Sequence, residues 1–117
     1  MYKVIVAGGR DFNDYERLEQ VLNHLLKHKL PDVEIVSGKA RGADTLGERY
    51  AHTLGLPVKA FPANWNAYGK SAGYRRNKEM AEYADACVVF WDGSSKGSKH
   101  MIDLALSHGL PTRVDSY

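Results

Sequence analysis

The stretch Val36-Ser37-Gly38-Lys39-Ala40-Arg41-Gly42-Ala43-Asp44 decides the fold that this sequence predicts. An apolar strand over residues 34–37 runs into a glycine-rich turn, and a helix is expected from about residue 43 to residue 54. Gly38 and Gly42 let the backbone turn tightly and approach a ligand, because neither carries a Cβ atom. The turn also supplies a hydroxyl group and two cations, on Ser37, Lys39 and Arg41. With the positive end of the helix dipole beside them, these groups predict an anion site, typically for phosphate; a plain structural turn is the alternative.

Two further apolar runs end in similar loops. Residues 3–7 (KVIVA) precede Gly8-Gly9-Arg10-Asp11, and residues 87–91 (CVVFW) precede the segment 92–99 (DGSSKGSK). The carboxyl ends of parallel strands share one edge of a sheet, and ligands bind at that edge. Three loops rich in glycine and cations therefore indicate one shared anion site rather than three unrelated turns.

The whole chain alternates strands and helices. Strands are expected at residues 3–7, 34–37, 58–61, 86–91 and 112–115. Helices are expected from Asn13, which forms a capping-box pattern with Glu16, to about Lys29, and then over residues 43–54, 74–84 and 99–108. In the second helix the residues expected to face inward are Leu46, Tyr50 and Leu54. Right-handed crossovers then predict an α/β fold, an open parallel five-stranded sheet with helices on both faces.

Composition narrows the class of protein. The 117 residues contain no linker or composition shift, which predicts a single domain over residues 1–117. A net charge of +2 gives no strong field for nucleic acid or an anionic membrane. No apolar run reaches the roughly 18 residues of a membrane span, so no membrane partner is expected. The single Cys87 lies in an apolar run and predicts a reduced, cytoplasmic setting.

The segment Pro62–Gly73 (PANWNAYGKSAG) is expected to be a long loop. Loops of this length in compact domains are often lids, and Trp65 or Tyr68 could close over a base by stacking. The alternative is that both rings plug the sheet edge. Arg76 and Asn77 follow at the expected start of the third helix, where a cation is unfavourable for the dipole and indicates a solvated surface or a shared anion.

Several familiar sites are not matched. Residues 8–13 (GGRDFN) do not form the G-x-G-x-x-G dinucleotide fingerprint. Residues 93–99 (GSSKGSK) are one residue short of a P-loop and reverse its Lys-Ser/Thr pair, so nucleotide hydrolysis with magnesium is not predicted. The histidines have no cysteine or carboxylate spacing typical of zinc, and no metal site is expected.

Several stretches together resemble the SLOG superfamily of Rossmann-like nucleotide-binding domains, and most closely its cpYpsA-related branch of small single-domain proteins. They cover nearly the whole chain, at residues 6–12, 36–44, 55–57, 61–73, 76–80, 84–86 and 91–101. Residues 37–44 are similar to the SGxAxGxD turn of the DNA-uptake protein DprA. Residues 76–101 are similar to the region of the LOG phosphoribohydrolases that runs from a catalytic arginine to a PGGxGTxxE loop.

The resemblance implies a strand order of 3-2-1-4-5, a nucleotide-type ligand and a homodimer. Arg76 falls on the LOG catalytic arginine. The LOG phosphate-binding glycines and threonine fall on Gly93, Gly97 and Ser98, with Ser94 and Ser95 inserted between the two glycines. Met101 stands at the position of the LOG catalytic glutamate, which puts hydrolase activity in doubt.

Three functions compete. The preferred hypothesis is a module that binds a nucleotide or a nucleotide-derived ligand for sensing or processing. The alternative is a LOG-like enzyme that cleaves the N-glycosidic bond of nucleoside monophosphates, with Arg76, Asp92 and Glu79 as candidate catalytic residues and Asp11 as a further carboxylate. The third is DprA-like binding of single-stranded nucleic acid, which the net charge disfavours. The candidate ligand-binding residues are Gly8, Gly9, Arg10, Asp11, Ser37, Gly38, Arg41, Gly42, Asp44, Trp65, Tyr68, Arg76, Asn77, Asp92, Gly93, Gly97 and Ser98.

Overall fold

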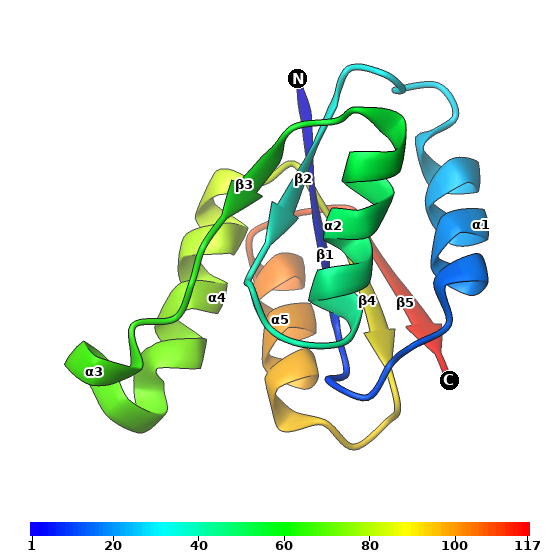
Figure 1. Ribbon diagram of the computed structural model, residues 1–117. Helices are drawn as coiled ribbons and strands as arrows, with labels where there is room; N and C mark the ends of the chain where they lie inside the picture. Colours follow the sequence, from blue (N-terminus) through cyan, green and yellow to red (C-terminus); the bar gives the residue numbers. More distant parts are fainter.

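Five strands pair side by side in the computed structural model, which describes residues 1–117 (Figure 1). The strands are β1 (Tyr2–Gly8), β2 (Val33–Ser37), β3 (Val58–Ala60), β4 (Ala86–Trp91) and β5 (Thr112–Ser116). All four pairings are parallel and the strand order is β3-β2-β1-β4-β5. The α/β fold, the parallel sheet and the order expected from the sequence are therefore confirmed.

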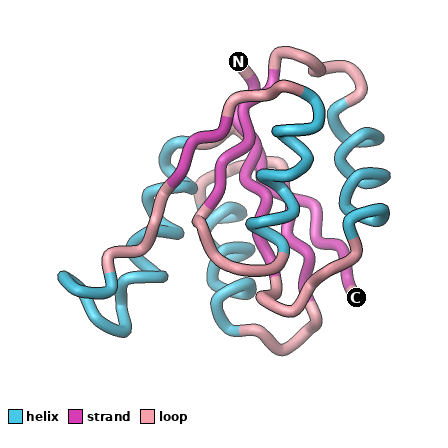
Figure 2. The backbone as a smooth tube through the Cα atoms, in the orientation of Figure 1, coloured by secondary structure: helices cyan, strands magenta, loops and turns pink.

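Five α-helices and one 3-10 turn connect the strands. They are α1 (Tyr15–Leu26), α2 (Ala43–Leu54), α3 (Trp65–Tyr68), the 3-10 turn η1 (Gly69–Ser71), α4 (Ala72–Tyr83) and α5 (Lys96–Ser107). Helices α1 and α2 pack on one face, where Leu18 and Tyr50 join the core around Val4 and Val6. Helices α4 and α5 pack on the other, where Met80 and Met101 contact the cluster around Ile5. Figure 2 shows these helix pairs on opposite sides of the strands.

The helices that connect successive strands switch from one face of the sheet to the other at the boundary between β1 and β4. The chain leaves β1 through α1 on one face, and it reaches β4 through α4 on the other face. In a doubly wound sheet this reversal opens a crevice at the carboxyl ends of the two central strands. The register places Gly8 of β1 opposite Phe90 of β4 at that end. The fold thus gathers the loops after β1, β2 and β4 at one edge.

Three helix starts differ from the sequence-based expectations, two of them because of their side-chain caps. Asp14, not Asn13, caps α1, and its carboxylate accepts the Arg17 N–H at 3.1 Å. Ser95 caps α5 by accepting the Ser98 N–H at 3.4 Å, so this helix begins three residues earlier than expected. Helix α4 begins two residues early, at Ala72. Arg76 therefore lies beyond the first turn of α4 rather than at its start.

Two further expectations on this part of the chain were wrong. Leu54 is exposed rather than inward, because α2 packs on the sheet through small residues, including Ala43, Gly47 and Ala51. The segment 62–73 is not an extended loop, since it folds into α3, capped by Asn64, and then into η1. None of the helices is long and apolar enough to cross a membrane.

Candidate functional site

A pocket of about 470 Å³ opens at the carboxyl edge of the sheet. We call it the sheet-edge pocket. It brings together residues that the sequence pointed to in separate segments, namely Gly8, Gly9, Arg10, Asp11, Asp44, Trp65, Arg76, Asn77, Asp92, Gly97 and Ser98. Its other lining residues are Ala7, Ala40, Lys70, Gly73, Tyr74, Met80, Ser95 and Met101. The loops after β1 and β4 and one face of α4 therefore form its wall.

A second, smaller pocket of about 250 Å³ adjoins it over the turn after β2. We call it the turn pocket. Its lining residues are Arg10, Gly38, Lys39, Ala40, Arg41, Pro62, Ala63, Trp65 and Arg76. The predicted residues Gly38 and Arg41 line only this second pocket. The predicted residues that line neither are Ser37, Gly42, Tyr68, Glu79 and Gly93.

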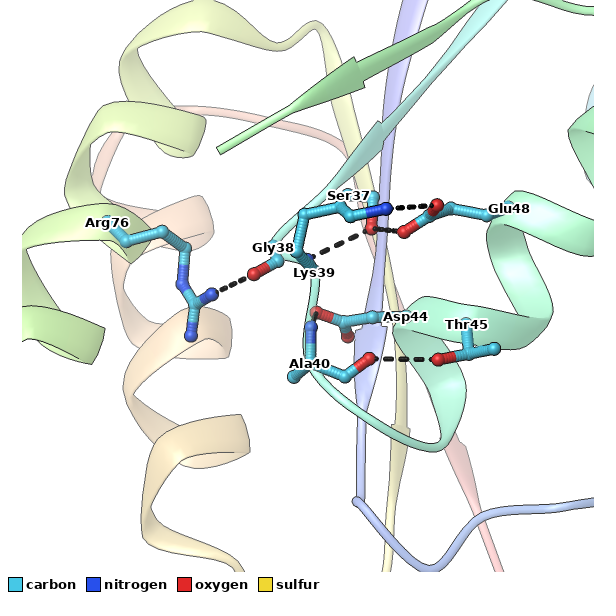
Figure 3. Close-up of polar contacts among 8 residues, drawn as sticks. All are labelled: Ser37, Gly38, Lys39, Ala40, Asp44, Thr45, Glu48 and Arg76. Atoms are coloured by element: carbon cyan, nitrogen blue, oxygen red, sulfur yellow. Dashed lines mark hydrogen bonds and ion pairs between the residues drawn. The ribbon is translucent and has the colours of Figure 1, made fainter. Parts of the chain in front are cut away.

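The hydroxyl group of Ser37 holds the turn together through hydrogen bonds within the protein (Figure 3). It donates to Glu48 Oε2 at 2.7 Å and accepts the Lys39 N–H at 3.1 Å. Lys39 Nζ lies 2.7 Å from Glu48 Oε1 and neutralises that carboxylate. Ser37 is fully buried. Its hydroxyl group and the ammonium group of Lys39 are both engaged within the protein.

Asp44 presents a buried carboxyl group between the turn and the sheet-edge pocket. Its Oδ2 accepts the Ala40 N–H at 3.2 Å, which ties the turn to the first turn of α2. Burial raises the pKa of Asp44 to about 6, although the Ala40 hydrogen bond and the charge of Arg76 act in the opposite direction. A carboxyl group with a raised pKa in a pocket is a common property of functional sites.

Arg76 links the turn after β2 to helix α4. Its guanidinium donates through Nη1 to the Gly38 carbonyl and through Nε to Asn77 Oδ1 at 3.0 Å. Figure 3 shows the side chain reaching across from α4 toward the turn. Burial lowers the pKa of Arg76, the charge of Asp44 opposes this, and the charge of Arg10 lowers it further. Asn77 continues the chain of contacts, because its Nδ2 lies 3.4 Å from the Gly97 carbonyl of α5.

Close backbone packing accounts for two of the predicted glycines. Gly8 has φ +151°, and a Cβ there would lie 2.2 Å from the Phe90 carbonyl oxygen. Gly42 has φ +76°, and its Cβ would lie 2.1 Å from the Gly9 carbonyl oxygen. Any larger residue at either position would collide with backbone. Both glycines are therefore needed for the fold, whether or not a ligand lies against Gly8.

The loop after β4 uses its own donors internally. Asp92 Oδ1 accepts the N–H groups of Ser94 at 2.9 Å and Ser95 at 2.8 Å. These hydrogen bonds lower the pKa of Asp92, so a carboxylate stands at the mouth of the expected phosphate loop. The Ser98 N–H is directed to Ser95 Oγ. Gly93 lies outside both pockets, and Gly97 and Ser98 are helical residues rather than loop residues.

The two aromatic residues of the segment 62–73 have different surroundings. Trp65 is 50% exposed and lines both pockets, so its ring is available to a ligand. Tyr68 lines neither pocket, and the Arg75 guanidinium lies 4.3 Å from its ring centroid. Glu79 is exposed and lines neither pocket. Met101 is buried in the wall of the sheet-edge pocket.

The sequence reasoning missed Lys70, Gly73, Tyr74 and Met80. A signal for two of them was present, since Gly73 and Met80 share one helix face with the predicted residue Asn77, at spacings of four and three residues. The expected helix start at residue 74 left out only Gly73, which joins this face because α4 begins at Ala72.

Comparison with known proteins assigns the family. The model of the YspA, cpYpsA-related SLOG family matches residues 2–68, more than half of the chain. The chain belongs to this family. The gene 61 protein of Mycobacterium phage D29 is 32% identical over 117 residues, covering 95% of this chain and 94% of the phage protein. Membership places the chain among domains related to nucleotide binding or processing.

Solved structures share the fold. DNA processing protein A (DprA) from Streptococcus pneumoniae superposes with a TM-score of 0.77 at 20% identity, over 97% of this chain and 50% of DprA. The C-terminal domain of the PF1911 hydrogenase from Pyrococcus furiosus gives a TM-score of 0.50 at 17% identity, over 97% of this chain and 90% of that domain. The chain thus spans about half the length of DprA. At these identities the likeness concerns the fold alone.

Proposed function

We propose that the protein binds a nucleotide or a nucleotide-derived small ligand in the sheet-edge pocket. The observation that carries the proposal is the convergence there of three carboxylates, three cations and the half-exposed ring of Trp65. A volume of about 470 Å³ lies within the range of small-molecule sites. Carboxylates accept hydrogen bonds from sugar hydroxyl groups, cations attract phosphate, and an indole ring stacks on a base.

Paired aromatic variants test this proposal. We expect Trp65→Ala to weaken the binding of adenosine 5′-monophosphate by roughly tenfold, because stacking of one base is worth about 1–3 kcal/mol. Tyr68→Ala removes a ring of similar exposure from the same segment, but that ring lines neither pocket. The affinity of Tyr68→Ala for adenosine 5′-monophosphate is expected to equal that of the wild type. Isothermal titration of both variants makes the measurement, and an equal loss in the two would contradict a specific role for Trp65.

A thermal-shift screen of nucleoside mono- and diphosphates and nucleotide sugars identifies the ligand class. A ligand present at about 100 times its dissociation constant adds roughly 2.7 kcal/mol to the free energy of unfolding. If no compound of the panel raises the melting temperature, the proposed ligand class is wrong.

A second candidate function is cleavage of the N-glycosidic bond of nucleoside monophosphates. Asp11, Asp44 and Asp92 line the pocket and could supply the carboxylate that such a reaction needs. Glu79 does not line the pocket, so we propose the three aspartates rather than Glu79 for this role. Binding of single-stranded nucleic acid remains the least favoured proposal. The homodimer and the cytoplasmic location implied above also stay predictions.

A further inference from the structure

The two adjoining pockets differ in charge. The sheet-edge pocket is balanced, since Arg10, Lys70 and Arg76 face three aspartates in its wall. The turn pocket is lined by four cations, Arg10, Lys39, Arg41 and Arg76, and by no carboxylate. The pockets share Arg10, Ala40, Trp65 and Arg76, so one ligand can extend from the first into the second.

Three of the four cations in the turn pocket lack an ionic partner. Lys39 pairs with Glu48, whereas Arg10, Arg41 and Arg76 take part in none of the ion pairs of the structure. The Arg10 charge contributes to the lowered pKa of Arg76, which means that the two guanidinium groups repel each other. A bound anion between them would relieve this repulsion, and guanidinium groups match phosphate geometrically.

The loop after β4 is a poor alternative location for a phosphate. Its Ser94 and Ser95 N–H groups are taken by Asp92, and its Ser98 N–H group is taken by Ser95 Oγ. The Asp92 carboxylate would also lie beside the phosphate and repel it. The balanced charge of the sheet-edge pocket suits a neutral, hydroxyl-rich group better than a phosphate.

We infer that the turn pocket is the phosphate subsite of this protein, formed by Arg10, Arg41 and Arg76, and that the sheet-edge pocket receives the sugar. The inference rests on the proposed function for the identity of the sugar-bearing ligand. The phosphate lies over the turn after β2 rather than at the start of α5. Trp65 lines both pockets and is placed to contact the base or the sugar between them.

Arg41 allows a specific test because it lines only the turn pocket. The quantity to measure is the phosphate preference, the ratio of the affinities for adenosine 5′-monophosphate and adenosine. We expect Arg41→Gln to lower this ratio roughly tenfold, the effect of losing one charge-assisted hydrogen bond. The control is Lys27→Gln, which makes the same change in net charge at an exposed position after α1 that lines neither pocket.

Gly97→Ala examines the rival location, because it adds a methyl group at the start of α5 where no atom lies within 4 Å. A phosphate preference that falls in Gly97→Ala and stays at the wild-type value in Arg41→Gln would overturn the inference. Equal losses in Arg41→Gln and Lys27→Gln would also overturn it, since only net charge would then matter.

Inorganic pyrophosphate provides a probe that does not depend on the nucleotide proposal. Titration followed by phosphorus NMR is expected to show weaker pyrophosphate binding to Arg41→Gln than to the wild type and Lys27→Gln. If the nucleotide panel fails while this dependence on Arg41 holds, the proposed function is wrong and the anion subsite stands. If pyrophosphate binds independently of Arg41, the subsite is wrong even where nucleotides bind.

Discussion

Asp44 carries its charge at a position where burial makes ionisation unfavourable. Its pKa of about 6 in the folded chain compares with an ordinary value of 3.8. A carboxyl group whose pKa is raised on folding favours the folded state while it is protonated. That contribution is complete below about pH 4 and is lost as the pH rises through 6. The difference between the two values corresponds to roughly 3 kcal/mol as an upper limit.

We therefore expect Asp44→Asn to stabilise the protein at pH 7.5, by roughly 1–3 kcal/mol. The amide oxygen can still accept the Ala40 N–H, so the turn keeps its hydrogen bond. The advantage of the variant should shrink as the pH falls to 4.5, because Asp44 is then neutral in the wild type as well. Urea unfolding at several pH values measures this. A variant that is less stable than the wild type at every pH would mean that the ionised carboxylate supports the fold.

At the residue scale the sequence indicated which segments meet at the sheet edge, but not the contacts between their side chains. The glycines and cations after three strands correctly indicated which segments meet at the sheet edge. The roles of Ser37 and Lys39 were hidden, because both depend on Glu48, one turn beyond Asp44 on α2. Asp92 was a candidate catalytic and ligand-binding residue, and its hydrogen bonds within the loop were not expected, although an aspartate two residues before Ser94 is a common turn cap. Predicting such hydrogen bonds requires knowing how a turn packs against a helix, and no single segment of the sequence carries that information.

At the element scale, the apolar patterns predicted which helices and strands form. They did not predict the residues at which the helices begin and end. The 3.6-residue apolar stripe of Leu18, Val21, Leu22, Leu25 and Leu26 predicted that α1 forms, although Leu25 is exposed and the helix ends at Leu26 rather than near Lys29. The apolar runs predicted the central strands. Helix α5 begins three residues earlier than expected, because Ser95 caps it despite Gly97, which had indicated a loop. Helix α4 begins two residues early without a side-chain cap. The mistaken start of α4 left Gly73 out of the side of the helix that lines the pocket.

Gly47 shows how closely α2 approaches the sheet. A Cβ at this position would lie 2.9 Å from Val6 Cβ, in the buried centre of β1. Alanine favours a helix over glycine by about 1 kcal/mol, but overpacking of a core costs about 1–3 kcal/mol. We expect Gly47→Ala to lower the free energy of unfolding by roughly 1 kcal/mol in urea titrations.

Gly97→Ala is the matched control for this effect, because Gly97 is also a helical glycine and its added methyl group meets no atom within 4 Å. Its stability should equal or slightly exceed that of the wild type. Equal stability changes in the two variants would show that helix propensity, and not the contact of α2 with Val6, decides the outcome.

At the scale of the whole molecule, the carboxylates of the sheet-edge pocket decide whether the proposed ligand would be turned over. Cleavage of an N-glycosidic bond needs a carboxylate that stabilises positive charge or activates water. The resembling hydrolases carry a glutamate where this chain has Met101, which is buried in the pocket wall. The remaining carboxylates are partly engaged, since Asp92 Oδ1 holds two backbone N–H groups and Asp11 Oδ1 accepts the Tyr117 hydroxyl at 2.6 Å.

We therefore expect no release of free base from nucleoside monophosphates above the rate without protein. A thioether cannot take a proton, and the loss of general acid–base help typically costs about 10²–10⁴ in rate. Chromatography of incubations at pH 6 and pH 7.5 makes the measurement, with Asp44→Asn and Asp92→Asn as diagnostic variants and Glu79→Gln as the control outside the pocket. The protein would be shown to be an enzyme if the wild type releases base and this release disappears in either aspartate variant but persists in Glu79→Gln. In that case the raised pKa of Asp44 would mark it as the proton donor to examine first, because the reaction would be faster at pH 6.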